Sequence, residues 1–241
     1  MPEHIGSLAL RERGGAVVSL RDGFYALDFV SGACRKLADP EPGKPRIRMN
    51  DGKVDREGRF VAGYMDYQER DPICALFRLD PTGAVAKVDD GIVCSNGPCW
   101  SPHGRTFCFA DTYTREIWAY DYDMETGVAT NRHVFCSFPA AGLKGLPDGA
   151  TVDAEGFVWS VSVYEGKLVR FAPDGKLDRV VGLAVESTTS LSFGGSGLDV
   201  AYVTSMARAV KGAKPKEREA GALFAVHGLG VRGLPEPRFA G

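Results

Sequence analysis

Apolar residues in this chain occur in short runs separated by turn sequences, and the same arrangement recurs five times. Each unit has a glycine-containing turn, a β-rich run, a second turn and another β-rich run. The first runs are 11–20, 55–65, 101–111, 153–163 and 193–205, and the second runs are 23–34, 75–85, 116–129, 167–177 and 221–231. Short runs rich in Val, Phe, Tyr, Trp and Ala predict strands. No segment between them has the 3.6-residue apolar period of an amphipathic helix, which argues against βαβ units.

The spacing of the units predicts a β-propeller. Successive first turns are anchored 44, 46, 52 and 41 residues apart, on Gly14, Gly58, Gly104, Gly156 and Gly197. A period of about 40–50 residues with about four strands per unit is typical of propeller blades. We therefore expect an all-β chain in which residues 1–241 form one propeller domain with five complete blades. The pattern leaves open whether the ring closes with five blades or lacks a blade.

Three segments just before strands of successive units carry an oxygen-bearing side chain beside a glycine. The segments are 47–55 (IRMNDGKVD), 94–101 (CSNGPCWS) and 146–153 (LPDGATVD), with Asn50, Asn96 and Asp148 at equivalent positions. Each alone is typical of a turn, but three in register around one axis predict a site for a hard cation. Arg48 precedes Asn50 by two residues and adds a donor suited to carboxylate or polyol oxygens.

Charge and the chain ends limit the classes of partner. The formal net charge of −2 gives no reason to expect nucleic acid or an anionic membrane surface as a partner. The basic run 211–218 also contains Glu, Pro and Gly, and we interpret it as a solvated loop. The N-terminus lacks a signal-peptide pattern and no apolar run reaches the length of a membrane span, so we expect a cytoplasmic protein.

At the three segments the chain resembles the regucalcin/gluconolactonase family, also named for senescence marker protein 30 and luciferin-regenerating enzyme. The resemblance covers essentially the whole chain and includes RMNDGKVDREGRFVAG, SNGPCWSPHGRTFCFADT, LPDGATVDAEGFVW and LFAVHGLGVRGLPEPRFAG. It implies a six-bladed propeller that binds one divalent metal at the mouth of its channel. It also implies hydrolysis of sugar lactones to aldonic acids.

The resemblance further implies roles for four residues. The family's metal-binding Asn corresponds to Asn96, and its metal-binding and catalytic Asp corresponds to Asp148. Its substrate-contacting Arg and Asn correspond to Arg48 and Asn50, with Asn50 close to the metal as a direct or water-mediated ligand. The implied cofactor is one divalent cation, and Ca²⁺, Mg²⁺, Mn²⁺, Zn²⁺ and Fe²⁺ all remain open.

One part of the family pattern has no counterpart in this chain. The remaining metal ligand of the family is a Glu in an N-terminal E-G-P-x-W segment, about one blade upstream of Met1. We therefore expect a chain that lacks most of the first blade. A translation start at an internal Met and a true deletion would both produce this pattern.

Three functions remain open at this point. The first is metal-dependent opening of an aldonolactone, in which the cation polarises the carbonyl and Asp148 moves the proton. The second is a non-catalytic or degraded metal-binding propeller, which the absent Glu favours. The third is a related esterase or phosphotriesterase-type hydrolase on the same fold. The polar segment 64–72 is expected to overhang the channel and to favour a small sugar lactone as partner. An exposed blade edge leaves a homo-oligomer open.

Overall fold

The computed structural model describes residues 3–208 and 215–241, and residues 211–214 of the basic run lie outside this part. Its strands form five antiparallel sheets in chain order. The first three sheets are β1 (Ser7–Leu10), β2 (Ala16–Leu20), β3 (Gly23–Leu27), β4 (Cys34–Ala38); β5 (Ile47–Val54), β6 (Phe60–Asp66), β7 (Cys74–Leu79), β8 (Val85–Ile92); and β9 (Ser95–Trp100), β10 (Thr106–Asp111), β11 (Glu116–Tyr122), β12 (Ala129–Ser137). The last two are β13 (Leu146–Val152), β14 (Val158–Val163), β15 (Lys167–Phe171), β16 (Leu177–Gly182); and β17 (Thr188–Gly194), β18 (Val200–Ser205), β19 (Leu223–Val226).

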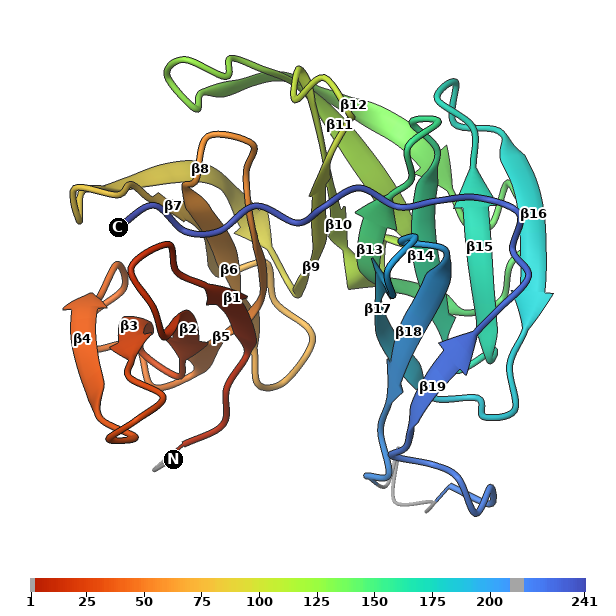
Figure 1. Cartoon of the computed structure of the whole chain (residues 1–241), viewed down its shortest axis with the longest axis horizontal. Coiled ribbons are helices and arrows are strands. Elements are labelled where there is room, and N and C mark those ends of the chain that lie inside the picture. The colour runs from red at the N-terminus through yellow and green to blue at the C-terminus, as the bar shows by residue number, and fades with distance from the viewer. Residues whose placement is uncertain (1–2, 209–214) are drawn as a thin grey trace.

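The sheets are arranged as propeller blades around a common axis (Figure 1). Their first strands lie innermost, and β1, β5, β9, β13 and β17 contact one another in that order. Apolar cores fill the space between consecutive sheets, and one core includes Phe24, Phe60 and Phe107 of the first three sheets. In the described part of the chain, no comparably extensive contact joins the first sheet to the fifth. The predictions of an all-β chain and five blades are therefore confirmed, and the sixth blade stays a prediction.

The fifth blade differs from the expectation of five complete units. It has three strands in the described residues, whereas each of the other blades has four. The second run of this unit, 221–231, contributes only β19, because the chain leaves the sheet after Val226. A 3-10 helix (η1, Thr112–Thr114) interrupts the all-β pattern between β10 and β11.

Bulges interrupt four of the five innermost strands. On β5, the residue pairs Met49–Tyr64 and Gly52–Ala62 leave Asn50 and Asp51 opposite one residue of β6. The pairing is also shifted on β9, β13 and β17, whereas β1 pairs regularly with β2. Because a bulge inserts an extra residue and redirects the side chains beside it, these strands can place consecutive residues on the same side of the sheet.

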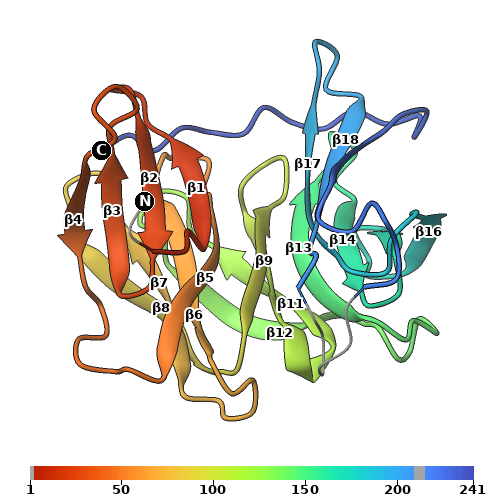
Figure 2. The same ribbon diagram turned by 90° about the horizontal axis from the view of Figure 1, so that it is seen from below.

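The chain after β19 crosses one face of the ring and returns to the first blade (Figures 1 and 2). Its backbone bonds to the fourth blade from Ala154 to Arg232 at 2.8 Å, and to the first blade from Phe239 to Leu10 at 2.9 Å. The Phe239 side chain is 2% exposed and belongs to the core of the first three blades. This segment therefore connects blades that are far apart in sequence.

Glu236 in the same segment bonds to innermost strands of two blades on that face. Its carboxylate accepts hydrogen bonds from Lys53 Nζ of β5 and Thr151 Oγ1 of β13, each at 3.1 Å. Lys53 Nζ also bonds to the Ala150 carbonyl at 2.9 Å. Polar side chains thus bridge the innermost strands of the second and fourth blades on the face that this segment crosses. No helix in the described residues is long and apolar enough to cross a membrane.

Candidate functional site

A pocket of about 390 Å³ opens at the other end of the channel, near the starts of the innermost strands. Arg48, Asn50, Asn96 and Asp148, the four residues singled out in the sequence, all line it. The structure therefore brings together residues that are as much as 100 positions apart in the chain. Their roles as ligands, base and substrate contacts stay predictions.

Their position in the fold differs from the expectation that they precede strands. Asn50 lies within β5, Asn96 within β9 and Asp148 within β13. The Asn-Asp-Gly, Asn-Gly and Asp-Gly sequences that suggested turns belong to bulged stretches of strand. A bulge and a tight turn both need glycine or a small polar residue, so the local sequence does not distinguish them.

Hydrogen bonds link Arg48, Asn50 and Asn96 across two blades. Arg48 Nη1 donates to Asn50 Oδ1 at 2.9 Å. Asn50 Nδ2 then donates to Asn96 Oδ1 at 3.0 Å, and Asn96 Nδ2 donates to Thr112 Oγ1 of η1 at 2.6 Å. Because Thr112 holds its amide nitrogen and Asn50 its amide oxygen, the Asn96 side chain has a fixed orientation in the pocket wall. Asn96 is 4% exposed, so this orientation is fixed in a nearly dry setting.

Asp148 lies on the bulge of β13, beside Gly149. Burial raises the pKa of its carboxyl well above the ordinary value, and the negative charge of Asp51 raises it further. The positive charges of Arg208 and Arg48 oppose this effect without reversing it. A carboxylate in this setting holds a proton more tightly than an exposed one, which suits a group that accepts and returns protons.

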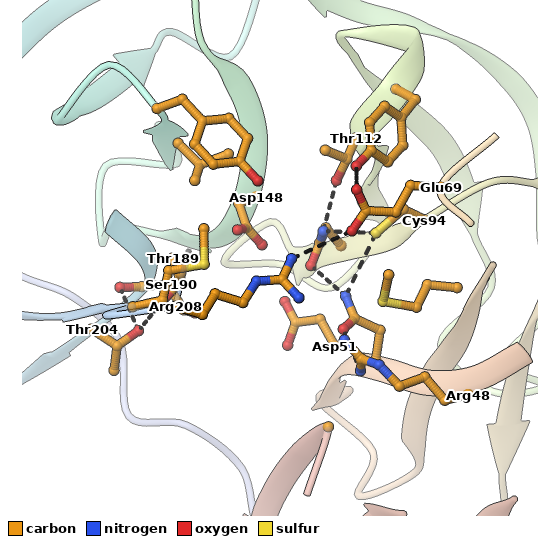
Figure 3. Close-up of a pocket in the computed structure, with 18 residues that line it drawn as sticks. Arg48, Asp51, Glu69, Cys94, Thr112, Asp148, Thr189, Ser190, Thr204 and Arg208 are labelled. Atoms are coloured by element: carbon orange, nitrogen blue, oxygen red, sulfur yellow. Dashed lines mark hydrogen bonds and ion pairs between the residues drawn. The ribbon is translucent and has the colours of Figure 1, made fainter. Parts of the chain in front are cut away.

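Asp51 is a site residue that the sequence analysis missed. The sequence pattern singled out Asn50 and not its neighbour Asp51, which lines the same pocket. Its Oδ1 accepts a hydrogen bond from Gly52 N at 2.8 Å, and its Oδ2 accepts one from Gly97 N at 2.9 Å. Figure 3 shows the carboxylates of Asp51 and Asp148 directed into the same part of the pocket. The one sequence feature that could have indicated Asp51 is its position directly after Asn50. Neighbouring residues of a strand line the same pocket only where the strand is bulged, and the sequence does not show that β5 is bulged.

Glu69 and Arg208 form part of the pocket rim and were also missed. Glu69, in the segment expected to overhang the channel, accepts a hydrogen bond from the Tyr113 hydroxyl and lies 3.4 Å from Arg208 Nη2. Glu69 has a positive φ of 55° and Tyr164, also on the pocket wall, has one of 67°. Such backbone angles are costly for residues other than glycine and are concentrated at functional sites.

Arg48 is a cation without an anionic partner in residues 3–208 and 215–241. Its Nη1 bonds to the Met49 carbonyl and to Asn50 Oδ1, both neutral oxygens. Burial lowers the pKa of its guanidinium below the ordinary value, and the nearby charge of Arg208 contributes to this shift. A half-buried guanidinium with free donors that lines a pocket is suited to bind ligand oxygens.

The residues at the base of the pocket fit a divalent cation. Two carboxylates, Asp51 and Asp148, and the amide oxygen of Asn96 border the same space. In the described part of the chain, no Lys, Arg or His nitrogen lies within 4.0 Å of either carboxylate. Buried carboxylates are usually paired with a cation, and an oxygen-only donor set suits hard ions such as Ca²⁺, Mg²⁺ or Mn²⁺.

Comparisons with known proteins agree with this fold. The sequence profile of the SMP-30/Gluconolactonase/LRE-like region matches residues 1–207. The chain is 37% identical to regucalcin of Xenopus laevis over 244 residues, which cover 98% of this chain and 81% of that protein. A luciferin-regenerating enzyme superposes with a TM-score of 0.91 at 26% identity, covering 100% of this chain and 83% of that one.

A second solved structure is similar over nearly the same length. A calcium-binding regucalcin from Agrobacterium tumefaciens has a TM-score of 0.88 at 27% identity, covering 99% of this chain and 80% of that one. The match of the profile to most of the chain and the identity to regucalcin are both sufficient to assign a family. The chain therefore belongs to the SMP-30/gluconolactonase/LRE-like family.

Proposed function

We propose that this protein is a divalent-metal-dependent hydrolase that opens a sugar lactone to the aldonic acid. The observation that supports this most strongly is the pocket itself, in which Arg48, Asn50, Asn96 and Asp148 meet at one end of the channel. Membership of a family that includes gluconolactonases supports the reaction class. The calcium-binding description of the regucalcin from Agrobacterium tumefaciens supports a cation at this site.

Asn96 and Asp148 would hold the cation, with Asn50 close to it. When bound, a divalent ion withdraws electron density from the lactone carbonyl and stabilises the oxyanion that develops there. Asp148 accepts a proton from water as the water oxygen bonds to the carbonyl carbon. When the bond from that carbon to the ring oxygen breaks, Asp148 returns the proton to the ring oxygen. The product is the open hydroxy acid.

Arg48 and Asn50 would orient the substrate through its hydroxyl groups. Asn50 already receives a hydrogen bond from Arg48, so the pair presents a rigid set of donors and acceptors to a polyol. Thr112, Thr189, Ser190 and Thr204 add hydroxyls to the pocket wall. This polar lining favours a sugar lactone over an apolar ester, since an apolar group would leave the free donors of the Arg48 guanidinium without acceptors.

The test is acid release from gluconolactone and xylonolactone, followed with a pH indicator and corrected for spontaneous opening. We expect release that a chelator abolishes and that Ca²⁺, Mn²⁺ or Zn²⁺ restores. Asp148→Ala should lower kcat by at least about 100-fold because the proton acceptor is lost. Asp174→Ala, in an exposed turn away from the pocket, should keep the normal rate.

Other outcomes would select the competing functions. Cation binding without acid release would support the non-catalytic propeller. Release of acid from aryl esters but not from lactones would support the esterase alternative. Turnover that survives both chelation and Asp148→Ala would overturn the proposal. A cytoplasmic location and the absence or presence of self-association stay predictions.

A further inference from the structure

Asp51 is placed in the pocket by a bulge. In a regular strand Asn50 and Asp51 would point to opposite faces of the sheet, because side chains alternate. On β5 the two residues together face one residue of β6, between the pairs Met49–Tyr64 and Gly52–Ala62. Both side chains therefore line the same pocket. A carboxylate is thus added beside the amide that the sequence pattern had singled out.

The orientation of this carboxylate is fixed from two blades. Gly52 N of its own strand donates to Oδ1, and Gly97 N of the neighbouring strand β9 donates to Oδ2. Each carboxylate oxygen can accept two hydrogen bonds or ligands, so each keeps one free lone pair. Figure 3 shows the carboxylate directed toward the space it shares with Asp148. Asp51 is therefore oriented and only partly satisfied by the protein.

The free lone pairs of the Asp51 carboxylate do not bond to a cationic side chain of the described residues. Lys53, the nearest lysine on the same strand, forms its ion pair with Glu236 at 3.1 Å, at the other end of the channel. Arg48 bonds to neutral oxygens, and Arg208 pairs with Glu69. Asp51 and Asp148 thus share a pocket as two acidic groups, and among the described residues neither forms an ion pair within 4.0 Å, although Lys53 acts on Asp51 at longer range and Arg208 and Arg48 act on Asp148. Like charges in such a place need either a shared proton or a bound cation.

We infer that Asp51 is a direct oxygen ligand of the divalent cation, together with Asn96 and Asp148; this rests on the metal dependence in the proposed function. Two carboxylates neutralise the charge of one divalent ion, whereas Asp148 alone leaves an excess positive charge in a largely buried site. Charge count is one of the quantities that sets affinity at oxygen-ligand sites. Asp51 would supply the second acidic ligand from within this chain, so no acidic residue preceding β1 is required for binding.

The test measures cation binding in the full chain, without any use of turnover. Metal-free protein is titrated with Ca²⁺ and Mn²⁺ by calorimetry, for the wild type, Asp51→Asn and Glu69→Gln. Asp51→Asn should weaken binding by at least about tenfold. Glu69→Gln removes the same charge from the same pocket, but Glu69 is already occupied by Tyr113 and Arg208, so its effect should be within about threefold. Circular dichroism checks that both variants fold.

A second measurement separates direct ligation from an indirect effect. Terbium replaces Ca²⁺, and its luminescence lifetimes in H₂O and D₂O count the water molecules bound to the ion. Asp51→Ala, checked for folding in the same way, is used here because Asn keeps an oxygen that can still bind the ion. It should add about one water molecule, because each vacated position at an oxygen-ligand site is filled by water. An unchanged water count would overturn direct ligation, and equal affinities for Asp51→Asn and Glu69→Gln would overturn any role for Asp51 as ligand. A wild type that binds no cation would instead overturn the metal dependence in the proposed function.

Discussion

At the scale of single residues, the site is defined by the partly buried carboxylates of Asp51 and Asp148, which line the same pocket. Burial raises the pKa of Asp51 as well as that of Asp148, although Lys53 and two backbone N–H groups oppose the shift at Asp51. Outside the pocket, Glu165 shows the opposite behaviour. Burial would raise the pKa of Glu165, but Lys167 and the backbone of Gly145 lower it to about 2. The difference follows from the partners of the two groups, since Lys167 bonds to the Glu165 carboxylate and, in the described residues, no cationic side chain bonds to Asp148.

The raised pKa of Asp148 predicts a pH-dependent cost in the metal-free protein. The folded state retains this proton above 3.8, where the unfolded state has lost it, so the free energy of unfolding falls as pH rises through that window. Asp148→Asn removes this cost, so its stability relative to wild type should improve from about pH 4 upward. Urea unfolding of chelator-treated protein at a series of pH values measures the difference. Saturating Ca²⁺ should reverse this difference in stability between Asp148→Asn and the wild type. A difference that stays the same at every pH would contradict the prediction.

At the scale of the structural element, the bulged innermost strands are the devices that build the site. Glycines beside the bulges let neighbouring innermost strands approach closely. A Cβ on Gly97 would lie 2.8 Å from the Asp148 carbonyl oxygen, and one on Gly149 would lie 2.1 Å from Ser190 Oγ. Gly97 also has a positive φ of 56° and donates to Asp51. One glycine therefore sets a backbone conformation, a strand spacing and a side-chain orientation.

The spacing role of Gly97 can be separated from its backbone conformation. Gly97→Ala and Gly83→Ala both place a side chain at a positive φ, which costs about 1 kcal/mol. Gly83 lies in a turn where an added Cβ meets nothing within 4 Å. Gly97→Ala should lower the free energy of unfolding by about 1–3 kcal/mol more, because β9 and β13 must separate. Denaturant unfolding measures the free energy of unfolding of both variants. Equal losses of stability would show that β13 moves away from the added Cβ without an energetic cost.

At the scale of the whole molecule, the segment after β19 packs against blades that are far apart in the sequence and links them to one another. Phe239 occupies the core of the first three blades, and its backbone pairs with Leu10 and Glu12 on the first blade. Glu236 of the same segment bridges Lys53 and Thr151 across the channel. The segment thus joins the ends of the series of blades on the face opposite the pocket.

Loss of this connection should destabilise the whole propeller. Phe239→Ala removes a side chain that is 2% exposed and should lower the free energy of unfolding by about 3–5 kcal/mol. Val30→Ala serves as the matched control, because Val30 is 98% exposed and its truncation should change stability by less than about 0.5 kcal/mol. Guanidinium unfolding measures both. Similar midpoints for the two variants would mean that the segment is only loosely attached.

Much of the fold could be predicted from sequence because strand periodicity and turn chemistry are local. The repeated turns at Gly58, Gly104 and Gly156 lie between the first and second strands of their sheets, as their spacing predicts. The fifth blade was less predictable, since the run 221–231 has the composition of a strand but pairs only through β19. Composition indicates what a segment can form, whereas pairing depends on the neighbouring strand.

By itself the sequence determined the all-β class, the repeat, the family, and the identity of Arg48, Asn50, Asn96 and Asp148 as candidates, because these follow from residue types and regular spacing. Tertiary structure alone decided that these residues lie within bulged strands, and that Asp51 joins them. The physical reason is that a bulge is a mismatch between two paired strands. Which side chains it turns into a pocket therefore depends on pairing partners and blade packing, which no single strand encodes.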